Sequence, residues 1–449
     1  MWRSAWPLLA IVSLTGSATS ASAETRPRYG GALMLDLHDV LTLTDPGDWP
    51  APLAGLVYDR LVQLDDRGRP QPGLASSWTH DSENKRWQFT IRPGAKFQDG
   101  SPITAASVRA SLKSWNNVEI SGEDSILIQT EKPSPDIPIE LAGVRNAILH
   151  RGSDGVTIGS GPFRITEWQA VRHAVFSANE DYWGGRPFLD TVELTMGRPL
   201  RDQLIDLELG KADLVELSLD QARGAAQRGM RTWRSLPLEL MALVFEPGHR
   251  AVEDTRLRRA VALAIDRAAI LNVLLEKQGE PAGALLPQWM TGWAFLFPAT
   301  RDLGRARDSA ALIQPVPRLS LTYVPSDPLS RSIAERIALN AREAGVVIQV
   351  LPDAKADMRI ARVRLRSHDS AQSLADIAAA LGLPQLIRPD GGTLETLYAA
   401  EQKVLADFRV VPLFYLPATY GLSARVRNWQ PAPGGNWRLE NVWLEARVP

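Results

Sequence analysis

Two segments of the chain alternate strictly between apolar and polar residues. Residues 86–91 read RWQFTI and residues 191–196 read TVELTM, with an apolar residue at every second position. Successive side chains of a strand point to opposite faces, so a period of two predicts strands with one buried face. Pro93-Gly94 and Asp99-Gly100 follow the first segment and predict a turn-rich connection, because glycine adopts a positive φ at the lowest cost.

A helical period of apolar residues marks other segments. Residues 104–115 show it, with Thr104 as a plausible N-cap. The clearest case lies between Arg256 and Leu275, where apolar residues fall on one stripe after Asp254 and Thr255. We expect a single helix there, capped by one of these two residues.

The second half of the chain contains a strand–helix–strand pattern. Residues 319–323 alternate, residues 333–341 form an apolar helical face that ends at Gly345, and residues 346–351 are rich in β-branched side chains. This order predicts a βαβ unit and therefore an α/β lobe. A further short helix is expected at residues 371–381.

The first segment has the layout of a secretory signal peptide. Arg3 precedes an apolar run from residue 6 to residue 14, and a stretch of small residues ends in Ala21-Ser22-Ala23. The run is shorter than the roughly 20 apolar residues that a spanning helix needs, and an uncleaved N-terminal anchor is the alternative. We expect cleavage after Ala23 and a soluble periplasmic protein that begins at Glu24.

Composition and charge narrow the function classes. The chain has 449 residues, 45% of them hydrophobic and 22% charged, which is typical of a globular protein with roughly two or three domains. Its 50 Lys and Arg against 51 Asp and Glu leave a net charge of -1 without a basic cluster, so no nucleic acid is expected as a partner. The absence of cysteine removes disulfides, thiolate nucleophiles and lipid attachment at the cleavage point.

Motifs of enzymes and metal sites are not found. The six histidines stand singly, without a second ligand at the spacing of a helical metal site. Gly159-Ser160-Gly161-Pro162 has the glycines of a phosphate loop, but its proline lacks the N–H that such a loop uses, so we interpret it as a turn. Asp65-Asp66 and the pair Asp36 and Asp39 are expected to be solvated carboxylates. The sequence therefore predicts a protein that is not an enzyme and has no cofactor or metal.

Several blocks of sequence resemble one known family. The most specific is residues 87–105, WQFTIRPGAKFQDGSPITA, which is similar to the family signature almost position for position. The other blocks are residues 30–33 (GGAL), 43–46 (LTDP), 57–61 (VYDRL), 72–78 (PGLASSW), 159–163 (GSGPF), 179–187 (NEDYWGGRP) and 264–267 (AIDR). The chain is identified on these blocks as a member of the extracytoplasmic solute-binding proteins of ABC importers, in the peptide/nickel class known as family 5.

The resemblance implies a fold and a function. The fold is α/β and two-lobed, like a class II periplasmic binding protein, with a small inserted α+β domain and a two-strand hinge near Phe245 and Leu416. The function is to capture a peptide or similar small solute between the lobes and to deliver it, as a monomer, to an ABC permease and its ATPase. The domain bounds implied are a signal peptide at 1–23, lobe I at 24–55, 157–245 and 425–449, the inserted domain at 56–156, and a shortened lobe II at 246–424.

Two departures from the family pattern concern the ligand. Residues 243–247, LVFEP, stand where the family usually has an Asn, and residues 281–312 are compressed. Peptide-binding members hold the ligand's amino group with an Asp late in lobe II, and no motif here matches that position. A peptide specificity is therefore not carried over, and a family member that serves as a signalling or assembly partner is the alternative function.

Candidate ligand residues follow from the chemistry of a closing cleft. Such a cleft favours aromatic walls with a few polar groups. Trp289 and Trp293 are the aromatic candidates, with packing in a shortened lobe as the alternative for both. Phe245 and Tyr415 lie on the two expected crossover strands, and Asp45, in the first Asp-Pro loop, is expected to face the tryptophans across the cleft.

Overall fold

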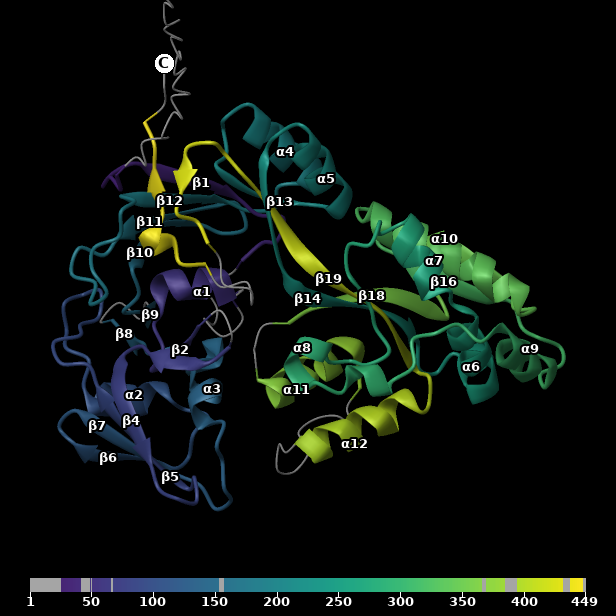
Figure 1. The fold of residues 1–449 in the computed structure, drawn as a ribbon, viewed down its shortest axis with the longest axis horizontal. Helices are drawn as coiled ribbons and strands as arrows, with labels where there is room; N and C mark the ends of the chain where they lie inside the picture. The colour runs from purple at the N-terminus through teal and green to yellow at the C-terminus, as the bar shows by residue number, and fades with distance from the viewer. Residues whose placement is uncertain are drawn as a thin grey trace, which may run out of the picture.

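One large sheet extends through both halves of the molecule. The computed structural model describes residues 26–41, 49, 51–65, 68–152, 157–365, 369–383, 394–430 and 437–446, and the predicted signal peptide lies outside them. The long strands β14 (Arg231–Phe245) and β19 (Val410–Leu422) lie side by side near the middle of the sheet. Figure 1 shows that they join two groups of elements, which we call lobe I on the N-terminal side and lobe II on the other.

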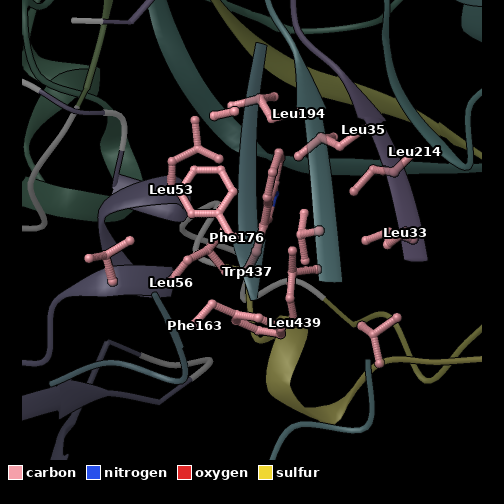
Figure 2. Packing of buried hydrophobic residues seen from close by; sticks show 14 of the residues in the cluster. Leu33, Leu35, Leu53, Leu56, Phe163, Phe176, Leu194, Leu214, Trp437 and Leu439 are labelled. Atoms are coloured by element: carbon pink, nitrogen blue, oxygen red, sulfur yellow. The ribbon is translucent and has the colours of Figure 1, made fainter. Parts of the chain in front are cut away.

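Lobe I is a sheet with helices on both faces. β1 lies between β12 and β13 and runs parallel to both, while β11 and β10 continue the sheet in antiparallel order. Leu33 and Leu35 of β1 are fully buried with Phe176 and Leu194 in the core that Figure 2 shows, and α1 covers this face. α4 and α5 cover the opposite face. The elements are β1 (Ala32–Asp36), α1 (Ala51–Val57), β10 (Phe163–Gln169), β11 (His173–Ala178), β12 (Thr191–Thr195), α4 (Leu200–Glu208), β13 (Leu214–Leu217), α5 (Leu219–Gln227), β20 (Val426–Arg427) and β21 (Trp443–Leu444).

A smaller domain is inserted in lobe I and has its own core. Its antiparallel sheet has the order β4-β5-β7-β6, and the predicted alternation is confirmed in β5, where Trp87, Phe89 and Ile91 are buried. Thr104 caps α2 as predicted, in a reciprocal pair of hydrogen bonds with Ser107. The elements are β2 (Val62–Leu64), β3 (Pro70–Pro72), β4 (Ala75–His80), β5 (Arg86–Ile91), α2 (Ala105–Ser111), β6 (Val118–Gly122), β7 (Ser125–Gln129), α3 (Ile137–Leu141), β8 (His150–Arg151) and β9 (Thr157–Ile158).

Lobe II also packs helices on both faces of its sheet. The predicted βαβ unit is confirmed by β16, α10 and β17, whose strands are parallel. α6, α7, α9 and α10 pack on one face, and α8, α11 and α12 pack on the other. The elements are α6 (Thr255–Ala264), α7 (Arg267–Val273), β15 (Glu280–Pro281), α8 (Gln288–Thr291), α9 (Leu303–Ala311), β16 (Leu319–Tyr323), α10 (Pro328–Glu343), β17 (Ile348–Pro352), β18 (Met358–Arg364), α11 (Ser370–Leu381) and α12 (Leu394–Leu405).

The single helix expected from Arg256 to Leu275 is wrong, because the chain breaks it into α6 and α7. Ile265 takes an extended conformation, and the carboxylate of Asp266 accepts a 2.8 Å hydrogen bond from the N–H of Ala269, capping α7. The apolar period hides this break, since the side chains before and after it enter the same core. A periodic pattern therefore located the buried face but missed the change of axis.

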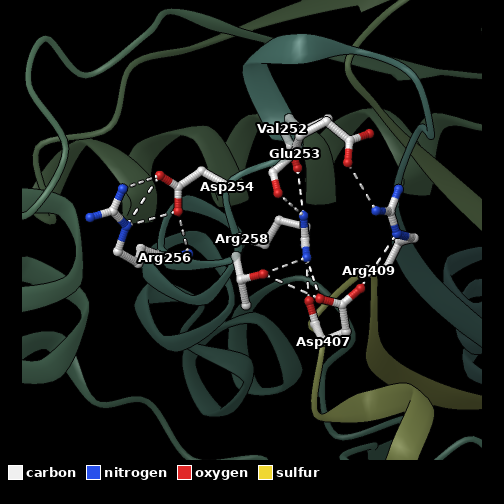
Figure 3. A network of polar contacts seen from close by, with 8 residues as sticks. Val252, Glu253, Asp254, Arg256, Arg258, Asp407 and Arg409 are labelled. Atoms are coloured by element: carbon white, nitrogen blue, oxygen red, sulfur yellow. Dashed lines mark hydrogen bonds and ion pairs between the residues drawn. The ribbon is translucent and has the colours of Figure 1, made fainter.

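A buried arginine fastens the beginning of lobe II to its end. Arg258 of α6 is 1% exposed and donates 2.8 Å hydrogen bonds to the carbonyls of Val252 and Glu253. It also bonds to the backbone and the carboxylate of Asp407, which precedes β19, as Figure 3 shows. The strand that enters lobe II and the strand that leaves it are thus fixed side by side.

Three of the sequence blocks quoted above meet at Asp59. This carboxylate is 4% exposed and accepts hydrogen bonds from Trp183 Nε1 at 2.7 Å, Tyr182 OH at 3.2 Å and Ser160 Oγ at 3.3 Å. Burial raises its pKa to about 6. The glycine-rich tetrad around Ser160 packs against the end of α1, so it joins lobe I to the inserted domain and has no room for a phosphate.

Candidate functional site

The large sheet narrows to two strands at one point. β13 pairs with β19 from Thr419 onward, and β18 pairs with β14 from Glu239 onward. Between them Pro237 lies opposite Pro417, and the pairing of β14 with β19 shifts register on both sides of Pro237. Proline donates no backbone hydrogen bond to a ladder. This proline pair is therefore the weakest section of the sheet and the natural hinge between the lobes.

The hinge predicted near Leu416 agrees with this position, whereas the one predicted near Phe245 is wrong. Phe245 lies at the far end of β14, pairs with Met358 of β18 and is fully buried in the core of lobe II. The apolar pattern of a long strand does not indicate where the strand crosses from one lobe to the other. In this chain Pro237 and Pro417 indicate the crossing point.

Parallel strands of both lobes end at this hinge. β1 and β13 of lobe I run toward it, because β13 is antiparallel to β19 and its last residue, Leu217, pairs with Thr419. β16 and β18 of lobe II run toward it from the other side, since β18 is antiparallel to β14 and Arg364 pairs with Glu239. Ligands of open α/β sheets bind outside the carboxyl ends of the strands. The two sets of strand ends therefore define the candidate site.

Arg364 connects the strand ends of the two lobes. Its Nη2 donates to Tyr420 OH at 2.7 Å, and its Nη1 lies 3.6 Å from Glu216 Oε1 of β13. Glu216 also accepts a 2.8 Å hydrogen bond from the N–H of His38, which follows β1. Burial raises the pKa of Glu216, and the nearby Tyr420 and Glu216 raise the pKa of Arg364, which stays charged.

Arg362 adds a second cation on the same strand. Its Nε donates to Glu239 Oε1 at 2.9 Å, and its Nη1 donates to Asp327 Oδ2 at 2.8 Å at the N-terminus of α10. The end of β18 thus presents two guanidinium groups, and each is matched by carboxylates from neighbouring elements. Such a surface has groups for both the positive and the negative end of a small zwitterion.

A second contact between the two sides joins the inserted domain to α11. Arg145 of the inserted domain donates from Nη2 to Asp376 Oδ1 of α11 at 2.9 Å. Burial, Asp369 of lobe II and Asp136 raise the pKa of Glu140, in α3, to about 7. The inserted domain and lobe II therefore contact each other directly through α11.

Trp289 is the predicted ligand residue that lies at the hinge. It is half-buried on α8, and its Nε1 donates to the carbonyl of Pro237 at 3.0 Å. A lobe II side chain thus contacts the hinge strand directly, and a rotation of the lobes would change the surroundings of its ring.

The other predicted ligand residues lie in the core of lobe II or outside the described chain. Trp293 is 9% exposed and donates from Nε1 to Glu401 Oε2 at 3.0 Å, and Tyr415, 3% exposed, bonds to the carbonyl of Leu285. Neither side chain, nor that of Phe245, offers surface to a solute in this arrangement. Asp45 lies outside the described residues.

Glu401 was missed by the sequence reasoning and explains the placement of Trp293. Its carboxylate is fully buried and accepts hydrogen bonds from the N–H groups of Leu285 and Leu286 as well as from Trp293. Burial raises its pKa. A signal existed in the sequence, since Glu401 stands between Leu397 and Val404 at helical spacing, on the buried face of α12.

The part of the chain that the structure describes has neither a candidate metal site nor a helix able to cross a membrane. In that part of the chain no three histidine or acidic side chains are grouped so that they could hold a metal ion. Across the same residues, every helix is too short or too polar to span a bilayer.

Comparison with known proteins gives one family. Residues 69–375 match the family model described as bacterial extracellular solute-binding proteins, family 5 Middle. A probable D,D-dipeptide-binding periplasmic protein of Escherichia coli is 25% identical over 390 residues, covering 78% of this chain and 75% of that protein. The nickel-binding periplasmic protein of the same organism is 24% identical over 351 residues, which is 66% of each chain. A crystal structure of NikA from Brucella suis in complex with Fe(III)-EDTA has a TM-score of 0.76 at 20% identity, covering 92% of this chain and all of the other.

Proposed function

We propose that this protein serves in the uptake of a solute, because the chain belongs to the bacterial extracellular solute-binding proteins of family 5. In this proposal the protein captures a small solute between its two lobes and delivers it to the permease and ATPase of an ABC importer. The observation that carries the proposal is the hinge at Pro237 and Pro417, with the strand ends of both lobes directed at it. A hinged pair of lobes is suited to enclosing a ligand and to signalling its presence by closure.

The solute class follows from the charges at the strand ends. Arg362 and Arg364 lie beside Glu216 and Glu239, so both signs of charge are available within one surface. A short peptide has a terminal ammonium and a terminal carboxylate, which these groups would bind. The relatives are named for a D,D-dipeptide and for nickel, which supports a peptide or a metal chelate as the ligand. Trp289, which lies at the hinge, is the aromatic side chain that we propose to contact the solute.

The test is a binding screen with a structural readout. The mature protein is titrated with di- to pentapeptides, with sugars and with nickel–histidine chelates, while tryptophan fluorescence and small-angle scattering are recorded. We expect a peptide or a chelate to bind at micromolar affinity or better, with a fall in the radius of gyration and a change in tryptophan fluorescence to which Trp289 contributes. Binding that leaves Trp289→Phe with the same fluorescence response as the wild type would place the ligand away from the hinge.

Two other outcomes of the screen would point to a different function. If no solute binds while an affinity column retains a partner protein, the chain is a signalling or assembly member of the family instead. Hydrolysis of a peptide by the purified protein would contradict the proposal outright.

Export to the periplasm is part of the same proposal. The domain bounds given above also belong to it, with the boundaries between the lobes moved from residues 245 and 425 to Pro237 and Pro417. The relatives are named as periplasmic, which supports it. Intact-mass measurement of protein released by osmotic shock should give a chain that begins at Glu24. A mass that includes residues 1–23 would mean that this segment is an anchor.

A further inference from the structure

The two arginines at the end of β18 lie on the same face of the strand, but their charges are matched very differently. Glu239 accepts two hydrogen bonds from Arg362, from Nε at 2.9 Å and from Nη2 at 2.5 Å, and Asp327 accepts one from Nη1 at 2.8 Å. Arg362 thus joins β18 to β14 and to the start of α10, and two carboxylates surround its single positive charge. A guanidinium bonded in this way has little left to offer to a solute.

Arg364 is held by fewer and weaker contacts. Its Nη2 donates to the neutral hydroxyl of Tyr420 at 2.7 Å, while the carboxylate oxygen of Glu216 lies 3.6 Å from Nη1, which is too far for a hydrogen bond. Within the described residues, no carboxylate accepts a hydrogen bond from Arg364, and most of its N–H groups have no acceptor. Since the side chain is 30% exposed, these N–H groups can take a further partner.

The phenol that meets Arg364 is fixed within lobe I. Tyr420 is 1% exposed, and its ring centre lies 5.6 to 6.0 Å from those of Trp233, Trp429 and Trp437. Burial raises the pKa of Tyr420, so its hydroxyl stays neutral. A neutral acceptor on a fixed ring orients a guanidinium without cancelling its charge.

Arg364 also lies where both lobes can reach the same small group. It is the last residue of β18, whereas Tyr420 and Glu216 belong to strands on the lobe I side of Pro417. The guanidinium therefore stands at the meeting point of the strand ends that define the candidate site. A group bound to it would be met by side chains of lobe I as well as of lobe II.

We infer that Arg364 binds the anionic group of the solute, a carboxylate in the case of a peptide, that Tyr420 is the positioning residue that holds it, and that Arg362 has a structural role. A carboxylate can accept two parallel N–H bonds from a guanidinium. It has to compete with Glu216, whose oxygen is too distant to hold Arg364 by a hydrogen bond. The statement about the solute rests on the proposed function, whereas the difference in availability between the two guanidinium groups does not.

The first test measures availability with the simplest carboxylate, acetate, and needs no knowledge of the solute. In protein that contains nitrogen-15-labelled arginine, the Nε–H resonances of the two residues are assigned by their loss in Arg364→Gln and in Arg362→Gln. Titration with acetate at constant ionic strength should shift the Arg364 resonance along a saturating curve and leave the Arg362 resonance nearly unchanged. Acetamide, the neutral analogue, should shift neither. An Arg364 resonance that does not respond to acetate, or equal shifts of both resonances, would overturn the inference.

The same two variants should also differ in stability. Arg362→Gln breaks three hydrogen bonds to carboxylates and leaves Glu239 and Asp327 without their shared cation. Arg364→Gln removes one hydrogen bond to a neutral group. The urea midpoint should therefore fall at least about twice as far in Arg362→Gln as in Arg364→Gln. The opposite order would contradict the roles assigned to the two arginines.

With peptides the readout is a preference. Dialanine and trialanine are compared with their C-terminal amides, and the wild type should bind the free peptides about tenfold more tightly or better, because a hydrogen bond between charged partners is stronger. Arg364→Gln should abolish this preference, and Tyr420→Phe, which keeps the ring, should reduce it. Arg362→Gln should weaken both forms to the same extent. The control is Arg359→Gln, at the other end of β18, where Arg359 pairs with Glu246 at 2.6 Å. It should keep the affinity and the preference of the wild type.

A preference that survives Arg364→Gln would overturn the inference, since a general structural defect weakens both forms alike. If the wild type binds no peptide, the peptide part of the proposed function fails, and the acetate titration and the urea midpoints decide the inference without it.

Discussion

Gly161 lies where the backbone before β10 passes close to α1, and it has no room for a side chain. A Cβ at this position would be 2.6 Å from the carbonyl carbon of Val57 and 2.7 Å from the carbonyl oxygen of Leu56. Both neighbours are backbone atoms, so they yield only if α1 moves. The sequence indicated a turn here, but the reason for the glycine is a close approach between segments far apart in the chain.

We therefore predict that Gly161→Ala lowers the free energy of unfolding by about 2–4 kcal/mol. The control is Gly122→Ala, whose Cβ would have its nearest neighbour, the Cβ of Ser125, at 4.0 Å, and which should stay within about 0.5 kcal/mol of the wild type. Urea denaturation of both variants measures the difference. Equal midpoints would show that α1 shifts without cost.

The conformation of single residues was predicted correctly where it depends only on neighbours in the sequence. Thr104 and Asp254 are helix caps, and Gly100 has a positive φ of 86°, as the Asp-Gly pair suggested. The placement of Tyr415 and Glu401 could not be predicted this way. Their partners come from other elements, and whether a side chain enters the core or the space between lobes depends on those neighbours.

At the scale of elements, periodicity located strands and buried faces but not the breaks between elements. The βαβ unit of β16, α10 and β17 and the helix α11 were predicted with nearly their observed bounds. The division into α6 and α7 was not predicted. It depends on two hydrogen bonds of Asp266: its carboxylate accepts from the N–H of Ala269, and its own N–H donates to Oδ1 of Asn340 in α10. A cap of this kind ends one helix and begins another because tertiary contacts stabilise it. The pattern of apolar residues contains no information about those contacts.

The facing elements α3 and α11 should make stability depend on pH. The pKa of Glu140 is about 7, raised by burial, by Asp369 and by Asp136, from an ordinary value of 4.5. Arg145 and Asp376 complete the charged groups at this contact. The unfolded chain loses the Glu140 proton first as pH rises, so stability falls between about pH 4.5 and 7 and is lowest above that range.

Glu140→Gln should therefore be more stable than the wild type by about 2 kcal/mol at pH 8, with the difference vanishing near pH 4. Thermal unfolding across this range is the measurement. Glu123→Gln, at the exposed turn between β6 and β7, serves as the control and should follow the wild-type curve. A constant difference at every pH would mean that the carboxylate of Glu140 is not the group responsible.

For the whole molecule, opposite charges of the two sides face each other at two places. Arg145 pairs with Asp376 on one side, and Arg223 pairs with Glu276 on the other. The arginines have side-chain exposures of 60% and 39%, so salt screens both pairs. The family resemblance gave the two-lobed plan, but these contacts appear only once the lobes are placed in space.

Raising sodium chloride from about 20 mM to 1 M should therefore increase the radius of gyration of the solute-free protein, because the Debye length falls from more than 10 Å to about 3 Å. Small-angle scattering is the measurement. The double variant Arg145→Ala with Arg223→Ala should be more open at low salt and respond less to added salt. A wild-type radius independent of salt would show that apolar contacts alone keep the lobes together.

The position of β19 also determines when the protein can fold. This strand lies between β13 and β14 in the sheet, yet it is made long after both, once the whole of lobe II has been synthesised. Until residues 410–422 arrive, β13 and β14 lack the strand that joins them, and lobe I has an open gap in its sheet. Pairing across such sequence distances is slow. The sheet that joins the two lobes can therefore be completed only after more than nine tenths of the chain has been made, although the inserted domain, whose core and sheet are its own, does not depend on β19.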